Sequence, residues 1–268
     1  MAKWIKYQDI NGFLVRPGVF RVNGAIQRED GICFTISSHG ATSCTLLLFH
    51  PQESEPYATL PFPESCHLGN TYSMVVYDLR KEEFEYAFQF DGPYEPEKGK
   101  IFNKDNIILD PYAEAVTGQR NWGERPEGGK DFVYKARVVQ SEFDWGDTKQ
   151  LEHPFEDLVI YETHVRGFTK DTSSGVKANG TFEGLREKIP YLKDLGINAV
   201  ELMPIFEFDE MESARIVDGQ KLYNYWGYNT VAFFAPNTSY AFNKEHNHEG
   251  NELKRLIYEL KENGIEVI

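Results

Sequence analysis

Three aromatic side chains stand close together in one polar stretch of the chain and are its clearest candidates for contact with a ligand. They are Tyr225, Trp226 and Tyr228, within the segment Y-N-Y-W-G-Y-N-T at residues 223–230. An aromatic plane packs well against an apolar face of a ligand and orients it without charge. The alternative is a local hydrophobic cluster that holds a long loop together.

Two carboxylates, Glu162 and Glu201, lie on predicted strands and are candidates for acid–base chemistry. Acid–base catalysis by a pair of carboxyl groups needs one of them ionised and the other kept protonated near neutral pH. The simpler interpretation is that both glutamates are structural and are held by Arg or Lys. For His164, which follows the same strand as Glu162, we likewise predict structural hydrogen bonding.

The elements that carry these residues begin with a strand, a helix and a second strand. Residues 158–161, L-V-I-Y, predict a strand buried on both faces, and residues 198–204 predict another. Between them, apolar residues recur at helical spacing from Phe182 to Leu195. Thr181 has the side chain of an N-cap, and Gly196 stands where the end of a helix favours a left-handed residue.

A further helix and strand follow this unit. A long loop reaches about His248, a second helix ends at Gly264, and I-E-V-I at residues 265–268 begins a third strand. Strands and helices in this order predict a parallel α/β fold with right-handed crossovers. Because two repeats cannot close a barrel of eight strands, we expect the chain to be the first part of a longer protein.

The N-terminal region has the two-residue period of β-strands. Apolar and other residues alternate in segments such as 84–90, F-E-Y-A-F-Q-F, with turn residues between the segments. Several short strands at this spacing predict a β-sandwich of immunoglobulin-like type. We therefore expect a sandwich over residues 1–115, an inter-domain connection over 116–156, and the start of a barrel over 157–268.

Composition excludes several classes of partner. The net charge of −14 would repel the phosphates of nucleic acids, and no apolar run approaches the roughly 18 residues that read as a membrane span. A neutral ligand fits better, and the absence of a secretory signal makes the cytoplasm the expected location. Cys33, Cys44 and Cys66, an odd number without C-x-x-C spacing, predict buried thiols and no zinc site.

Four segments carry a resemblance to a known family. The first runs from Asp91 to Ala115 and begins D-G-P-Y-E-P-E-K-G-K, and the second is V-I-Y-E-T-H-V-R-G-F-T at residues 159–169. The third covers residues 180–204, and the fourth is the aromatic segment at 223–230. In this order they resemble isoamylase-type glycogen or starch debranching enzymes of the α-amylase clan.

The resemblance implies both a fold and a function. The fold would be a glycogen- or starch-binding sandwich followed by the first two βα units and the start of the third strand of a (β/α)8 barrel. The function would be hydrolysis of α-1,6 branch linkages in glycogen, starch or limit dextrins. Tyr228 would stack on the sugar ring next to the cleaved bond, with Trp226 and Tyr225 as further substrate-binding candidates. No cofactor and no metal ion are implied.

No catalytic residue is carried over to this chain. The family's aspartate nucleophile, glutamate acid/base and second aspartate lie on later strands, expected beyond Ile268, so we expect the chain alone to be inactive. Two alternatives stay open. One is a non-catalytic α-glucan-binding module. The other is a transferase such as a branching or trehalose-forming relative, because the barrel fold hosts both hydrolases and transferases. The oligomeric state also stays open.

Overall fold

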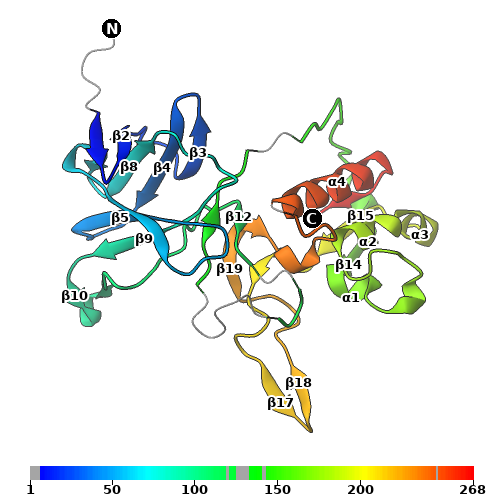
Figure 1. The fold of residues 1–268 in the computed structure, drawn as a ribbon. Coiled ribbons are helices and arrows are strands. Elements are labelled where there is room, and N and C mark those ends of the chain that lie inside the picture. Colours follow the sequence, from blue (N-terminus) through cyan, green and yellow to red (C-terminus); the bar gives the residue numbers. More distant parts are fainter. Residues whose placement is uncertain (1–6, 119–120, 125–132, 141–142, 246) are drawn as a thin grey trace. The chain divides into compact units, whose positions relative to one another are not determined.

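The computed structural model describes residues 7–118, 121–124, 133–140, 143–245 and 247–268. The chain divides into two compact units, the first formed by Met1–Thr117 with Glu127–Gln140 and the second by Gly118–Pro126 with Ser141–Ile268 (Figure 1). No helix among the described residues is both long and apolar enough to cross a membrane.

The first unit contains two antiparallel sheets. One sheet consists, in spatial order, of β1 (Gln8–Ile10), β2 (Phe13–Pro17), β8 (Thr71–Val76), β4 (Gly31–Ser37) and β3 (Gly24–Arg28), with β7 (His67–Leu68) also paired to β8. The other consists of β12 (Ala115–Val116), β13 (Ala136–Arg137), β9 (Glu85–Asp91), β5 (Ser43–Phe49) and β6 (Pro56–Pro61). A separate hairpin joins β10 (Tyr94–Glu95) to β11 (Lys100–Ile101).

Aromatic side chains join the two sheets into a sandwich. Phe34 on β4 meets Tyr86 on β9 edge to face, with 5.0 Å between ring centroids, and both rings are buried. The opposite face of β9 is buried as well, and there Glu85 forms an ion pair of 3.1 Å with Lys135. The two-residue period thus predicts the strand correctly, although it does not show that the second face is also covered.

Residues 133–140 add to this sandwich. Ala136 pairs with Tyr86 of β9 and with Val116 of β12, so this part of the predicted connection is sheet. The three cysteines are buried and free, as their number and spacing predict. The domain limits inferred from the sequence stay a prediction.

The second unit is built on a parallel sheet of three strands in the order β14 (Ile160–Thr163), β15 (Ala199–Leu202) and β20 (Glu266–Val267). Helix α1 (Val165–Thr169) follows β14 directly. Helices α2 (Phe182–Glu187) and α3 (Ile189–Leu195) precede β15, and α4 (His248–Glu262) precedes β20. Strands and helices alternate here as predicted, but α1 is an additional helix and the single predicted helix is divided into α2 and α3.

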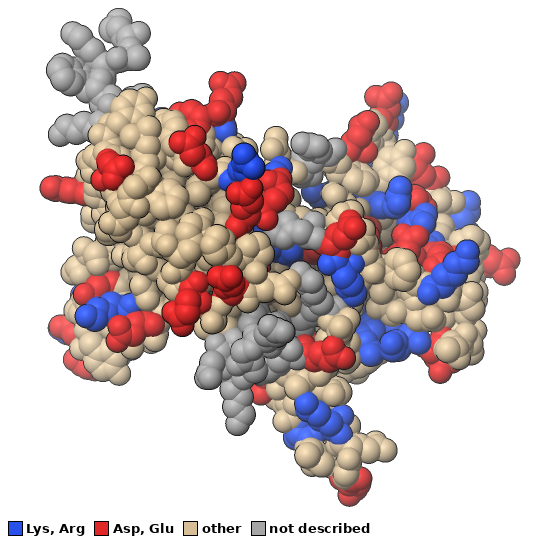
Figure 2. All heavy atoms as spheres, in the orientation of Figure 1, with Lys and Arg blue, Asp and Glu red and all other residues tan. Residues whose placement is uncertain are grey.

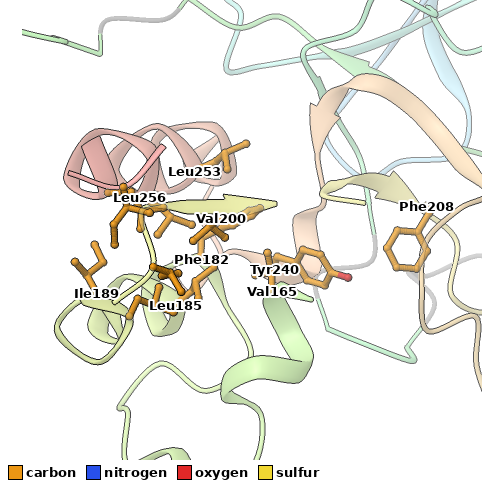
Figure 3. Packing of buried hydrophobic residues seen from close by; sticks show 13 residues of the cluster. Val165, Phe182, Leu185, Ile189, Val200, Phe208, Tyr240, Leu253 and Leu256 are labelled. Atoms are coloured by element: carbon orange, nitrogen blue, oxygen red, sulfur yellow. The ribbon is translucent and has the colours of Figure 1, made fainter. Parts of the chain in front are cut away.

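Helices α2 and α4 cover one face of the sheet. Figure 3 shows Phe182 and Leu185 of α2 and Leu256 of α4 gathered beside Val200 of β15, and all four side chains are buried. Burying a large apolar side chain of this kind is worth about 1.5–3 kcal/mol, which fixes the helices on the strands.

Local sequence signals account for the ends of the helical region. The Thr181 hydroxyl accepts a hydrogen bond from the Gly184 amide at 3.1 Å and so caps α2, as predicted. Gly196 ends α3 with φ of 84°, in the left-handed region. The helical spacing does not continue in one helix, however, because Pro190 stands in the first turn of α3 and has no amide hydrogen to extend α2.

Two further expectations for this unit are wrong. The first strand is expected from the sequence to be buried on both faces. It begins at Ile160, and its face with Ile160 and Glu162 is exposed because no described segment covers it. The segment predicted as a long loop holds strands, in which β16 (Phe206–Phe208) pairs with β19 (Thr230–Pro236).

The same segment also contains a hairpin of β17 (Arg215–Val217) and β18 (Gln220–Leu222). Its two-residue turn, Asp218-Gly219, has positive φ at both positions, which is the preferred geometry for a tight hairpin. Short 3-10 helices complete the fold at Glu64–Cys66, Pro96–Lys98, Phe155–Asp157, Thr172–Ser174 and Thr238–Tyr240.

Candidate functional site

The candidate site lies in segments that follow the carboxyl ends of two neighbouring parallel strands. His164 and Arg166 come directly after β14, and the aromatic segment 223–229 belongs to the long connection after β15. Segments that leave the carboxyl ends of adjacent parallel strands meet at one edge of the sheet, where α/β proteins commonly bind their ligands.

His164 holds this region together by hydrogen bonds. Its Nδ1 accepts from the Gly167 amide at 3.0 Å and so caps α1, while Nε2 lies 2.8 Å from the Tyr225 carbonyl oxygen. Because Nδ1 accepts, the proton is on Nε2, which donates to that carbonyl. Burial lowers the pKa of His164, so the neutral ring is favoured. The structural role predicted for this residue agrees with these contacts.

The three aromatic candidates differ in how freely their rings are presented. The Tyr225 ring stacks on His164 at 4.3 Å between centroids, and Trp226 meets Tyr225 edge to face at 5.3 Å. Tyr228 is 70% exposed, and its ring contacts no other aromatic ring among the described residues. The local-cluster interpretation therefore fits Tyr225 and Trp226, and the free face of Tyr228 is open to a ligand.

These side chains line one pocket of about 860 Å³, together with Tyr223 and Trp122. Trp122 forms part of its floor and lies parallel to the buried Tyr240 ring at 6.2 Å. The Arg166 guanidinium lies over the Trp122 ring, 4.4 Å from its centroid. Five aromatic residues around one hollow form a surface suited to the apolar faces of sugar rings.

The sequence interpretation missed Trp122 and Arg166. Trp122 stands in a polar stretch that the sequence predicts as an inter-domain connection, and Arg166 lies in a segment that carries only the family resemblance. A tryptophan in an otherwise polar, glycine-rich stretch was the one available signal for the first.

Two glycines allow the aromatic segment to approach its support. A Cβ atom at Gly227 would lie 2.6 Å from the Phe208 ring, and the φ of Gly227 is +80°. A Cβ at Gly167 would lie 2.0 Å from the Tyr225 hydroxyl. Glycine is therefore needed at both positions to bring Tyr225 and its neighbours down onto the core.

Two buried glutamates fix the floor beneath the pocket. Glu207 accepts a hydrogen bond from the Thr238 amide at 2.7 Å, and burial raises the pKa of Glu207 to about 8. Glu210 accepts from the Gly123 amide at 2.9 Å, and its main-chain carbonyl accepts from the Asn224 amide at 2.9 Å. Burial raises the pKa of Glu210 to about 7. Glu210 thus ties the Trp122 segment to the aromatic segment.

The strand glutamates do not form part of this pocket. Glu162 and Glu201 are register partners on β14 and β15, and both are exposed. Among the described residues, no group of three His, Cys, Asp or Glu side chains is placed to hold a metal ion.

Family models match both parts of the chain. Residues 23–113 match carbohydrate-binding module 48, the isoamylase N-terminal domain. Residues 141–268 match the alpha amylase catalytic domain.

Curated relatives include isoamylases of plants and glycogen debranching enzymes of bacteria. Isoamylase 1, chloroplastic, of Arabidopsis thaliana is 36% identical over 267 residues, which are 96% of this chain and 34% of the relative. A glycogen debranching enzyme of Yersinia pseudotuberculosis serotype IB (strain PB1/+) is 32% identical over 259 residues, covering 92% of this chain and 38% of the relative. The chain thus spans about a third of the length of these proteins.

Solved structures of pullulanases share the fold. Pullulanase type I from Bacillus subtilis str. 168, complexed with maltose, has a TM-score of 0.67 at 26% identity and covers 92% of this chain and 32% of that chain. Pullulanase from Paenibacillus barengoltzii, in complex with maltohexaose and alpha-cyclodextrin, has a TM-score of 0.72 at 22% identity over 92% of this chain and 37% of that chain. The chain thus consists of carbohydrate-binding module 48 sequence followed by alpha amylase catalytic-domain sequence, and its relatives are isoamylases and glycogen debranching enzymes.

Proposed function

We propose that the chain binds α-glucan in the aromatic pocket, as the N-terminal portion of a hydrolase that cleaves α-1,6 branch linkages in glycogen, starch or limit dextrins. The observation that carries the proposal is the free, exposed ring of Tyr228 at the mouth of a pocket with four further aromatic residues. A sugar ring that stacks on Tyr228 would have Trp226 beside it. The debranching relatives support this class of substrate.

The parallel sheet fits the proposed catalytic fold. We assign β14, β15 and β20 to the first three strands of a (β/α)8 barrel. Helices α2 and α3 together would be the helical segment after the first strand, and α4 would be the helix after the second. The N-terminal unit would be the immunoglobulin-like glucan-binding sandwich. In that arrangement the aromatic pocket lies at the carboxyl ends of the strands, where barrel enzymes build their sites.

The described carboxylates give no pair suited to retaining hydrolysis. Glu207 and Glu210 have pKa values raised toward neutrality, as a general acid requires, but both are fully buried and cannot reach a sugar. Glu162 and Glu201 lie outside the aromatic pocket. We therefore assign no catalytic residue and propose that these 268 residues bind glucan without cutting it.

The test is the affinity for maltohexaose after Tyr228→Ala, measured by calorimetry. We expect the dissociation constant to rise about tenfold, equivalent to about 1.4 kcal/mol, because the stacking plane is lost. Tyr228→Phe should keep most of the affinity, since the ring remains.

Tyr191→Ala is the matched control, because Tyr191 is a 50% exposed tyrosine on α3 that does not line the pocket. It should bind maltohexaose as the unchanged chain does. Unaltered affinity in Tyr228→Ala would place glucan binding on another surface and contradict the proposal.

A further inference from the structure

The aromatic pocket carries positive charge in an acidic protein. Arg166, Arg215 and Lys221 line it, and none of its described lining residues is an Asp or Glu. The whole chain has 42 Asp and Glu residues and 28 Lys and Arg residues, so the sign of the charge in the pocket is opposite to the net charge of the chain. Figure 2 shows Lys and Arg atoms on the β17–β18 hairpin that extends from its unit.

Arg166 is a half-buried cation with few partners. Its guanidinium lies over Trp122 but donates no hydrogen bond and forms no ion pair with any described residue. Burial lowers the pKa of Arg166, and the Glu210 carboxyl offsets this only in part. Because the pKa of Glu210 is about 7, that carboxylate is only partly ionised at neutral pH. A guanidinium has five N–H donors, so this group retains capacity for an anionic acceptor.

The hairpin supplies the other charges. The Lys221 ammonium lies 5.3 Å from the centroid of Tyr223, which is itself a pocket residue. Arg215 lines the same pocket from the neighbouring strand β17. Neither forms an ion pair with a described residue, and the nearby carboxylate of Glu212 is hydrogen-bonded to Asn229.

We propose that the pocket prefers an α-glucan that carries a phosphate ester, with the sugar on the aromatic rings and the phosphate between Arg166 and the β17–β18 hairpin. This rests on the proposed function, since it requires glucan in the same pocket. Aromatic planes meet the sugar, and guanidinium and ammonium groups meet the phosphate oxygens by charge-assisted hydrogen bonds. A neutral glucan would use the rings alone.

The experiment compares maltoheptaose with its phosphate monoester by calorimetry on the whole chain. At low salt we expect the phosphate ester to bind about tenfold more tightly, and this ratio to shrink as salt is raised because exposed charges are screened. Lys221→Gln should reduce the ratio to about threefold or less. Lys188→Gln is the matched control, since its ammonium also lies over a tyrosine, Tyr191, at 5.6 Å but outside the pocket.

The outcomes separate the two proposals. If both oligosaccharides bind with equal affinity, the phosphate preference is wrong and the proposed function stands. If neither binds, both are wrong. If inorganic phosphate alone binds as tightly as the ester, the cations form a site for free phosphate and not for phosphorylated glucan. An equal loss of the ratio in Lys188→Gln would show a general charge effect and would also overturn the inference.

Discussion

A single buried carboxyl group joins two segments that lie next to the aromatic pocket. Glu207 is completely buried on β16 and accepts the amide hydrogen of Thr238, which lies 31 residues further along the chain. Burial disfavours the ionised carboxyl and raises the pKa of Glu207 to about 8, from an ordinary value of 4.5. At neutral pH this side chain is mostly protonated inside the folded unit.

This pKa shift predicts a dependence of stability on pH. The folded chain keeps the Glu207 proton to higher pH than the unfolded chain does, so its contribution to stability is present below pH 4.5 and is lost as pH rises through about 8. Within that window the loss is up to about 1.4 kcal/mol per pH unit. Glu207→Gln keeps the shape and cannot ionise, so its unfolding free energy should fall less between pH 5.5 and about 8.5.

Urea unfolding followed by tryptophan fluorescence measures this difference. Trp122 reports on the region because its ring meets Phe208 of β16 edge to face at 5.8 Å. Glu262→Gln, at an exposed position on α4, should keep the pH dependence of the unchanged chain. Identical pH profiles for Glu207→Gln and the unchanged chain would show that ionisation of Glu207 does not limit stability.

At the scale of whole elements, the position of α2 depends on a close approach between its backbone at Gly184 and the segment that precedes it. A Cβ at Gly184 would lie 2.1 Å from the Ala178 carbonyl oxygen and 2.9 Å from the Thr169 hydroxyl. Glycine in a helix is intrinsically unfavourable by about 1 kcal/mol relative to alanine. It is retained in α2 because the segment before the helix passes directly over this position.

The same substitution should therefore have opposite effects in two helices. Gly184→Ala should lower the unfolding free energy by about 1–3 kcal/mol, because the methyl group collides with backbone. Gly250→Ala in α4 should raise it by up to about 1 kcal/mol, since nothing lies within 4 Å of a Cβ there. Thermal or urea unfolding of the two variants measures the pair, and a shift of both in the same direction would refute the close-approach argument.

Short-range signals explain which elements the sequence predicts well. The cap at Thr181, the left-handed Gly196 and the alternating strands depend on neighbours a few residues apart, and the structure contains each of them. The division of the helical region follows from Pro190, which has no amide hydrogen to donate, and the apolar spacing alone does not show it. The length of a strand and the burial of its two faces depend on the segments that pack against it, and the local sequence does not identify those segments.

The candidate site was predicted only in part for the same reason. The aromatic segment is contiguous and could be identified, whereas its floor is assembled from distant positions. The hydrogen bond between Gly123 and Glu210 joins residues 87 positions apart, and His164 reaches Tyr225 across 61 positions. Trp122, Arg166 and Glu210 have no local pattern that marks them as partners of Tyr228.

At the scale of the whole molecule, the described residues include more groups suited to packing on a sugar than groups suited to cutting one. The pocket offers aromatic planes and cations, while the carboxyls with pKa values nearest neutrality, Glu207 and Glu210, are buried beneath it. Retaining hydrolysis needs both a nucleophilic carboxylate and a protonated acid that touch the substrate about 5 to 5.5 Å apart. The described residues of the pocket include neither.

Binding without cleavage is therefore the expected behaviour of these 268 residues. In native gels that contain glycogen the chain should migrate more slowly than in gels without it, and Tyr228→Ala should reduce this retardation. Incubation with glycogen or a limit dextrin should release no reducing ends above a blank without protein. The first result tests the aromatic pocket, whereas the second tests the absence of an acid–nucleophile pair. Release of reducing ends by the chain would mean that accessible carboxylates such as Glu162 and Glu201 act catalytically, and Glu162→Gln would then have to abolish that release.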